Sequence, residues 1–192
     1  MHMATSTRRW TRADLADLPD DGNRYEVLDG KLLVTPQASM PHQAIAMRLS
    51  AALLPYVAHH ALGTVMGPGA VMFGDEELQP DVLVVPLDFD RIPEKWTSAP
   101  HPIFVAEVLS RSTRRRDLRD KPVAYQGLTI PDYWVIDRFE RRALVWTLGA
   151  SEPAIVTTEL RWQPRGDVEP LVIPLAELLP SRSARQPIDD EE

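Results

Sequence analysis

The chain has 192 residues, of which 44% are hydrophobic and 26% charged, an ordinary composition for a globular protein with its own core. It has no cysteine, which excludes disulfides and thiolate metal sites, and no apolar run approaches the roughly 20 residues of a membrane span. The net charge of −7 argues against a general nucleic-acid binder, although residues 111–121 are strongly basic. With no signal peptide visible at the N-terminus, we expect a cytoplasmic protein.

The first elements predicted along the chain are a short helix and a hairpin. Thr11 has the position of a cap for a helix that reaches about residue 18. Residues 24–28 and 31–34 are strand-like runs on either side of Asp29-Gly30, a dipeptide that favours a tight hairpin turn.

The middle of the chain alternates between helical and strand patterns. Apolar residues at helical spacing predict a helix over 42–61, and residues 64–73 look like a strand with a glycine-rich interruption. Two buried strands follow, over 80–86 and 103–109, with a long polar loop over 88–102 between them.

The C-terminal third completes an α/β pattern. A helix is predicted to begin at Asp120, with Pro122 tolerated in its first turn, and to end at Gly127. The other predicted elements are strands over 133–137, 143–147 and 171–173 and a helical turn over 174–179. We expect one domain over residues 1–180, a mixed central sheet flanked by helices, and a disordered acidic tail over 181–192.

Glu107 is the most informative residue of the sequence. It lies in the run 103–109, which is otherwise apolar on both faces and is typical of a central strand. Val105 and Leu109 share its face under the alternation of a strand, so its carboxylate is predicted to be buried. Burial of that charge is costly unless a cation or strong donors meet it. A buried ion pair with a nearby arginine is the structural alternative to a catalytic role.

Asp81 repeats this pattern at the mouth of the strand over 80–86. Two carboxylates delivered by two core strands suit one hard cation, Mg²⁺ or Mn²⁺, with water and substrate phosphate completing its coordination. The alternative for Asp81 is a purely structural role, in which it accepts hydrogen bonds from the amides of a turn.

Other polar residues are open to two interpretations each. Lys121 would be able to orient a nucleophile near the Glu107 strand, but its residue type alone favours a surface lysine. Glu26 is either a third acid or a solvent-facing residue of the hairpin. His42 begins a helix, where it caps, binds substrate or has no role. Arg114 and Arg115, in the basic segment, either bind phosphates or form a solvated face.

Several other functions are disfavoured by missing patterns. The histidines lack zinc-ligand spacing, the serines lack a nucleophile elbow, and the glycines form neither a P-loop nor a dinucleotide fingerprint. Tyr133 and Trp134 lie in a buried-looking strand, which favours core positions over a base-stacking platform.

The motifs, taken in chain order, form a recognisable series. They are Tyr25-Glu26, Asp29-Gly30, His42-Gln43, Pro80-Asp81, Glu107-Val108-Leu109-Ser110, Ser112-Thr113, Asp117, Lys121, Tyr125 and Pro131-Asp132-Tyr133-Trp134-Val135-Ile136-Asp137. This series resembles the Uma-two family of bacterial endonucleases, within the PD-(D/E)XK nuclease superfamily, over about residues 10–150.

The resemblance implies a restriction-endonuclease-like core in which Asp81 and Glu107 ligate a divalent metal. It also implies that Lys121 is the catalytic lysine and that Glu26 completes the acidic site. His42, Arg114, Arg115 and Tyr125 are then candidate substrate-binding residues. The chain departs from the pattern at three positions, which are Leu109 in place of the superfamily lysine, Arg111 in place of a proline, and Pro122 beside Lys121.

Three functions follow as hypotheses. The first is a Mg²⁺- or Mn²⁺-dependent endonuclease that acts on DNA, as a homodimer where both strands are cut. The second is a nuclease-fold module that binds nucleic acid or a protein partner without cutting. The third is an enzyme that acts on a smaller phosphate ester.

Overall fold

A six-stranded mixed sheet forms the centre of the computed structural model, which describes residues 8–180. Strands β7 and β8 are parallel, and every other neighbouring pair in this sheet is antiparallel. In sheet order the strands are β10 (Ala154–Val156), β9 (Arg142–Thr147), β8 (Asp132–Asp137), β7 (Phe104–Val108), β6 (Val82–Val85) and β3 (Thr64–Met66). The predicted mixed α/β fold is confirmed. The tail expected over 181–192 lies outside the described residues.

A second sheet, of four strands, contains the predicted hairpin. In sheet order its strands are β2 (Lys31–Thr35), β1 (Arg24–Leu28), β5 (Glu76–Leu78) and β4 (Val71–Phe73). Asp29 and Gly30 both have positive φ, 52° and 67°, which a two-residue type I′ turn requires. The single interrupted strand expected over 64–73 is wrong, because β3 and β4 belong to different sheets.

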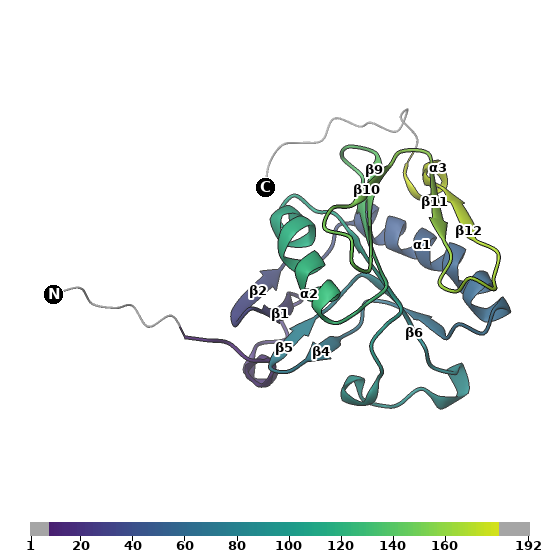
Figure 1. The fold of residues 1–192 in the computed structure, drawn as a ribbon. Coiled ribbons are helices and arrows are strands. Elements are labelled where there is room, and N and C mark those ends of the chain that lie inside the picture. The colour runs from purple at the N-terminus through teal and green to yellow at the C-terminus, as the bar shows by residue number, and fades with distance from the viewer. Residues whose placement is uncertain (1–7, 181–192) are drawn as a thin grey trace.

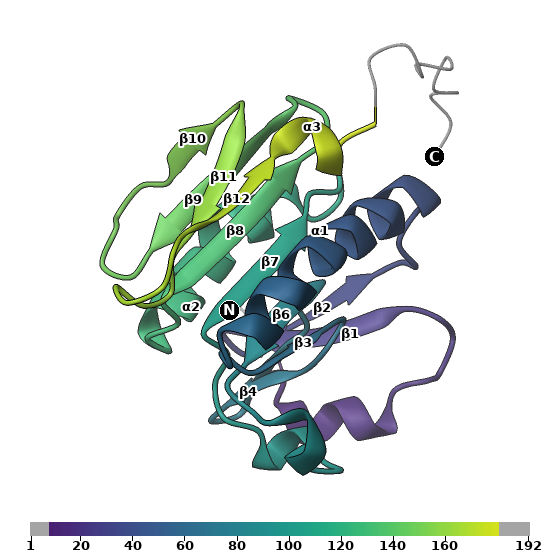
Figure 2. The same ribbon diagram turned by 90° about the vertical axis from the view of Figure 1, so that its right-hand side faces the viewer.

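Helices cover both faces of the six-stranded sheet (Figures 1 and 2). Helix α1 (Met40–His59) crosses one face, and α2 (Lys121–Gly127) lies on the other. Near α1, β11 (Glu159–Trp162) and β12 (Leu171–Pro174) form a separate two-stranded sheet, followed by α3 (Leu175–Leu178). Residues 8–180 also contain three short 3₁₀ helices: η1 (Arg12–Asp17), η2 (Phe89–Arg91) and η3 (Trp96–Ser98). Within residues 8–180, no helix combines the length and apolar character that crossing a bilayer requires.

The alternation of side chains along β7 divides the interior into two cores. Phe104, Ala106 and Val108 pack with α1 and with Trp134, whereas Val105 and Leu109 pack on the opposite face with Tyr125 of α2. Every residue of β7 is buried, as predicted for a central strand. Glu107 therefore projects into the second core, the one that α2 and the four-stranded sheet enclose.

Helix α2, which contains Pro122, begins where it was predicted, but helical structure also precedes it. Helix α2 starts at Lys121, with the proline in its first turn, but residues 114–115 are already helical and η4 (Arg116–Asp120) is a π-helical segment. Because proline has no N–H and crowds the preceding turn, the wider π-helical turn lets one continuous helical segment pass through it. The end at Gly127 is as predicted.

Asp132, the first residue of β8, links the six-stranded sheet to strand β11 of the two-stranded sheet. Its Oδ2 accepts a hydrogen bond from the indole Nε1 of Trp162 at 3.1 Å. Burial raises the pKa of Asp132 from 3.8 to about 6, and the Trp162 bond only partly opposes that rise. Since the pKa is higher in the folded state, this group's contribution to stability is complete below pH 3.8 and is lost as the pH rises through about 6.

We expect Asp132→Asn to stabilise the protein at pH 8 by up to about 3 kcal/mol, because the amide stays neutral and still accepts the indole bond. The gain should shrink steadily as the pH falls from 6 towards 4. Urea unfolding of both proteins across this range measures it, with the exposed Asp167→Asn as the control. A gain that is independent of pH would show that the charge of Asp132 is not its source.

Candidate active site

Asp81 and Glu107 converge at one end of two neighbouring strands. In the antiparallel pairing of β6 with β7, Val82 lies opposite Ala106, and the same register sets Asp81 opposite Glu107. Asp81 Oδ2 accepts a hydrogen bond from the backbone N–H of Val108 at 2.8 Å, which draws its side chain across to β7. Two acids 26 positions apart in the sequence are thereby held side by side.

Both carboxylate oxygens of Asp81 have partners. Oδ1 contacts Nη1 of Arg24 at 2.8 Å, and Oδ2 contacts Nε2 of His42 at 3.0 Å. Burial alone would raise the pKa of Asp81, but the hydrogen bond and charge of His42, with the Arg24 guanidinium and the Val108 amide, lower it below its ordinary value. The backbone at Gly67 lies close to the backbone of Asp81. Only glycine fits there, since a Cβ at Gly67 would lie 2.2 Å from the carbonyl oxygen of Asp81.

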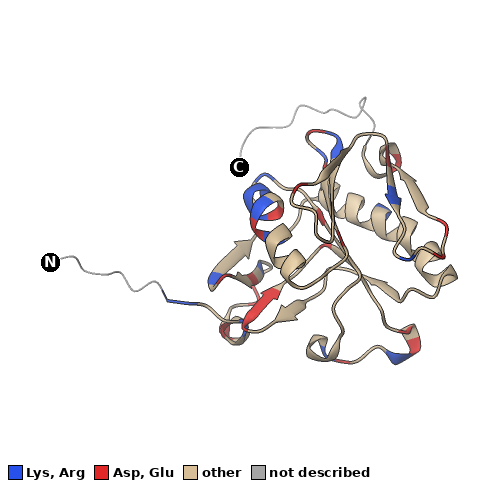
Figure 3. Ribbon diagram, viewed as in Figure 1, with Lys and Arg blue, Asp and Glu red and all other residues tan. Residues whose placement is uncertain are grey.

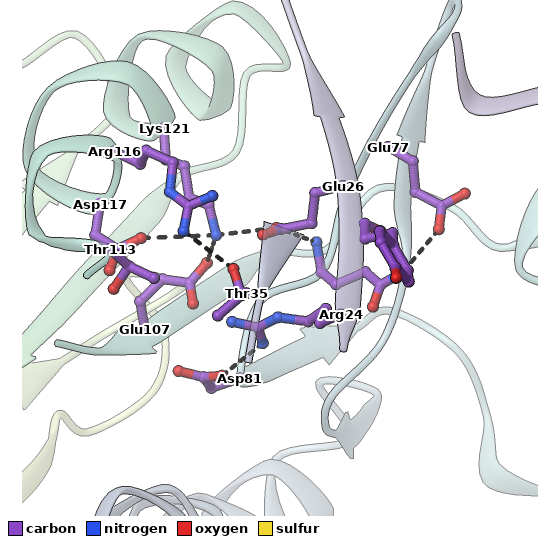
Figure 4. A network of polar contacts seen from close by, with 12 residues as sticks. Arg24, Glu26, Thr35, Glu77, Asp81, Glu107, Thr113, Arg116, Asp117 and Lys121 are labelled. Carbon is purple, nitrogen blue, oxygen red and sulfur yellow. Dashed lines mark hydrogen bonds and ion pairs between the residues drawn. The ribbon is translucent and has the colours of Figure 1, made fainter. Parts of the chain in front are cut away.

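Lys121 lies at the centre of a buried charge cluster (Figure 4). Its Nζ is 2.6 Å from Oε1 of Glu107, 3.0 Å from Oε1 of Glu26 and 3.7 Å from Oδ1 of Asp117. Glu26 and Glu107 come from strands of the two different sheets, whereas Asp117 and Lys121 come from the helical segment that packs over both. Lys121 and Glu107 are each only 1% exposed.

The pKa values of this cluster follow from burial and from neighbouring charge. Burial would lower the pKa of Lys121, but Glu107, Glu26 and Asp117 raise it well above its ordinary value and keep the ammonium protonated. Burial raises the pKa of Glu107, and the charges of Asp81 and Asp117 add to this against the opposing Lys121. Burial would also raise the pKa of Glu26, but Lys121 and Arg24 lower it.

Acidic side chains outnumber permanent cations at this site. The acids are Glu26, Asp81, Glu107 and Asp117, and the permanent cations that face them are Arg24 and Lys121. Oδ1 of Asp117 is buried and has no hydrogen-bond partner among residues 8–180. A site with this balance attracts a further cation.

A cleft of about 1050 Å³ opens onto the acids. Asp81, Glu107 and Asp117 line it, together with Arg24 and His42. Behind this wall Lys121 contacts Glu107, and Glu26 contacts Lys121.

The donor set fits a hard divalent cation. Carboxylate oxygens are the ligands that Mg²⁺ prefers, and Mg²⁺ is usually held by one or two of them, with waters and substrate phosphate filling the remaining positions. Asp81 and Glu107 match that description. Across the described part of the chain, no three His, Cys, Asp or Glu side chains are arranged to hold an ion by themselves.

Of the four candidate substrate-binding residues, two lie close to the acids of the cleft and two do not line it. His42 lines the cleft beside Asp81, and Tyr125 is buried with its hydroxyl 3.5 Å from Oε1 of Glu107. Arg114 pairs with Asp137 at 3.2 Å, and Arg115 is exposed outside the cleft lining. Neither of these two arginines lines the cleft.

Several interpretations left open by the sequence are now decided. Lys121 is not a surface lysine and Glu26 does not face solvent, because both are 1% exposed. The buried ion pair considered for Glu107 does exist, but its partner is Lys121 and not an arginine. Tyr133 and Trp134 are core residues, as predicted.

Arg24 and Asp117 were missed as members of the site, although the sequence carried a signal for each. Arg24 is two residues before Glu26 in β1, so strand alternation sets both on one face. Asp117 is four residues before Lys121, which is the spacing of neighbours on a helix.

Comparison with solved structures identifies the class of fold. The chain is similar to a crystal structure described as a "putative nuclease belonging to DUF820" from Anabaena variabilis ATCC 29413, with a TM-score of 0.69 and 17% sequence identity. The match covers 88% of this chain and 96% of that chain, so the fold is of this nuclease type.

Comparison of the sequence with family models identifies the family. The model of the Uma2 (Uma-two) family, described as "Putative restriction endonuclease", matches residues 12–178. The chain belongs to this family, and the resemblance noted in its motifs is confirmed. A search of curated proteins finds no match.

We expect Lys121→Met to destabilise the protein by roughly 3–5 kcal/mol, because it leaves three buried carboxylates without their ammonium. Chemical denaturation measures the change. Lys31→Met, at an exposed lysine paired with Asp29, is the matched control and should stay within about 0.5 kcal/mol of the wild type.

Adding Glu107→Gln to Lys121→Met should recover part of the loss, since one of the uncompensated charges disappears. Strictly additive effects of the two changes would contradict a direct interaction between these side chains.

Proposed function

We propose that this protein is a divalent-metal-dependent endonuclease that hydrolyses phosphodiester bonds in DNA. The observation that carries the proposal is the convergence of Asp81 and Glu107 at a cleft, with Lys121 in contact with Glu107. Membership of a family described as restriction endonucleases supports the nuclease class.

In this proposal Asp81 and Glu107 hold Mg²⁺ or Mn²⁺. A bound ion of this kind polarises a phosphoryl oxygen and lowers the pKa of an attacking water. Asp81 is suited to the role because His42, Arg24 and the Val108 amide lower its pKa and keep it ionised. The same contacts fix the direction of its carboxylate, and Gly67, which has no Cβ, leaves room for the backbone carbonyl of Asp81.

Lys121 and Glu26 have supporting roles in the same proposal. Lys121 keeps a positive charge against Oε1 of Glu107, and Glu107 itself lines the cleft. Because Lys121 lies behind the cleft wall, its charge acts on the nucleophile and on the phosphate through Glu107, the carboxylate that it holds in place. Glu26 assists by fixing Lys121, and it is itself held by the backbone N–H of Gln79 at 2.8 Å.

We also propose that the protein acts as a homodimer in the cytoplasm. Cutting both strands of a duplex takes two active sites, which a homodimer supplies. DNA as the substrate is compatible with the cytoplasmic location expected from the sequence.

A second candidate function is a nuclease-fold module that binds nucleic acid or a protein partner without cutting. The observation that favours it is the complete pairing of Asp81, whose oxygens are taken by Arg24, His42 and the Val108 amide. In such a module the ion pairs replace a metal and stabilise the fold alone.

We expect the wild type to nick supercoiled DNA and degrade single-stranded DNA in the presence of Mn²⁺, as followed by gel electrophoresis. Asp81→Asn and Glu107→Gln should each lose roughly 100-fold or more, since even outer contacts of metal sites are commonly worth about 10–100-fold. Glu152→Gln, at an exposed glutamate far along the chain, is the matched control. Cutting that survives Glu107→Gln would remove Glu107 from the mechanism.

Calorimetric titration with Mn²⁺ separates the two candidate functions without reference to activity. An endonuclease of the proposed kind should bind the ion with measurable heat, and Asp81→Asn should weaken that binding because it removes a ligand charge. Absence of heat in the wild type, with Glu152→Gln behaving identically, would favour the non-cutting module.

A further inference from the structure

Two arginines lie over one aromatic ring at the rim of the cleft. The guanidinium carbons of Arg111 and Arg138 are 5.5 and 4.4 Å from the ring centroid of Phe139. Arg111 follows the end of β7, and Arg138 and Phe139 follow the end of β8. Because β7 and β8 are neighbouring parallel strands, the segments that leave their carboxyl ends meet at the same edge of the sheet.

Positive charge is concentrated at this rim. Burial and the neighbouring charge of Arg111 lower the pKa of Arg138. The Nε atom of Arg138 is buried and has no hydrogen-bond partner among the described residues. A like-charged pair with a spare buried donor is the arrangement that an anion would stabilise.

The acid nearest in sequence is occupied by other groups. Asp137 accepts hydrogen bonds from the backbone N–H groups of Phe139 and Glu140 through Oδ1. Its Oδ2 contacts Arg114 at 3.2 Å and Arg142 at 3.6 Å. Asp137 therefore builds the turn that presents Phe139, and its charge is shared by two other arginines.

The rim and the acids belong to the same cleft. Arg111, Arg138 and Phe139 line it together with Asp81 and Glu107. One cleft therefore has an acidic wall and a basic rim, and basic residues also mark the adjoining helical segment before α2 (Figure 3). A polynucleotide has the chemistry that matches both parts, since it offers a phosphodiester to the acids and further phosphates of the same strand to the arginines.

We propose that Arg111 and Arg138 form a subsite for a backbone phosphate next to the scissile one, with Phe139 holding the two guanidinium groups in place. The planar guanidinium group binds phosphate through two parallel hydrogen bonds, a geometry that lysine does not reproduce. This inference rests on the proposed nuclease function, and it adds which residues hold the polynucleotide beside the scissile bond.

The first test is binding of a fluorescently labelled single-stranded DNA oligonucleotide, measured by anisotropy in EDTA so that no cutting occurs. Arg111→Gln with Arg138→Gln should weaken binding roughly tenfold or more, and should reduce the slope of log affinity against log salt by about one. Restoring the charge with lysine at both positions should recover only part of the affinity. Phe139→Leu should also weaken binding.

A double variant elsewhere removes the same charge and serves as the control. Arg161 and Arg165 are exposed, and Arg165 reaches the carbonyl of His60 at the C-terminal end of α1. The cleft contacts the N-terminal end of this 20-residue helix, which is roughly 30 Å long. Arg161→Gln with Arg165→Gln should leave binding unchanged. Equal weakening by both double variants would overturn the subsite.

The second test compares DNA with bis(4-nitrophenyl) phosphate, a small diester that cannot span the rim and the acids, both with Mn²⁺. The Arg111 and Arg138 double variant should raise KM for DNA roughly tenfold and leave the rate on the small diester unchanged. Equal losses on both substrates would overturn the subsite. If the wild type cuts neither substrate but binds DNA in an arginine-dependent way, the proposed function fails and the subsite stands.

Discussion

The contact between Lys121 and Glu107 is the interaction on which the rest of the site depends. It joins a central strand to the helical segment above it, and through Glu26 it joins both to the second sheet. All three side chains are only 1% exposed, so each charge is tolerated only while the other two are in place. The position of α2 over the sheet and the direction of the Glu107 carboxylate are therefore set together.

The two acids at the cleft have different electrostatic environments. Asp81 is held by cations and an amide that favour its ionised form, whereas Glu107 is more deeply buried and lies close to further negative charge. The two acids are neighbours across the β6–β7 pairing, yet their pKa values move in opposite directions. An incoming cation would benefit Glu107 most, because it would relieve the repulsion that burial intensifies.

The sequence revealed the elements and the acids better than it revealed their surroundings. The apolar run around Glu107 predicted both its burial and its need for a cation, because strand alternation is a local property. The Asp29-Gly30 turn was likewise readable from two residues. The sequence did not reveal that Lys121 is the cation that meets Glu107. Lys121 becomes buried only when the helical segment packs against a sheet that residues 24–35 help to build. The sequence likewise did not reveal that Arg111 and Arg138 lie over the same ring. Their proximity depends on β7 and β8 being neighbouring parallel strands.

The hydrogen bond from the Val108 amide to Asp81 has a consequence for the evolution of the chain. Regular pairing of β6 with β7 ends at Val82, and the aspartate side chain accepts the next amide in place of a backbone carbonyl. Loss of that side chain would leave a buried donor unsatisfied, which is costly whether or not any reaction takes place. Selection for folding alone would therefore retain this aspartate, and a descendant that had lost all enzymatic activity would still carry it.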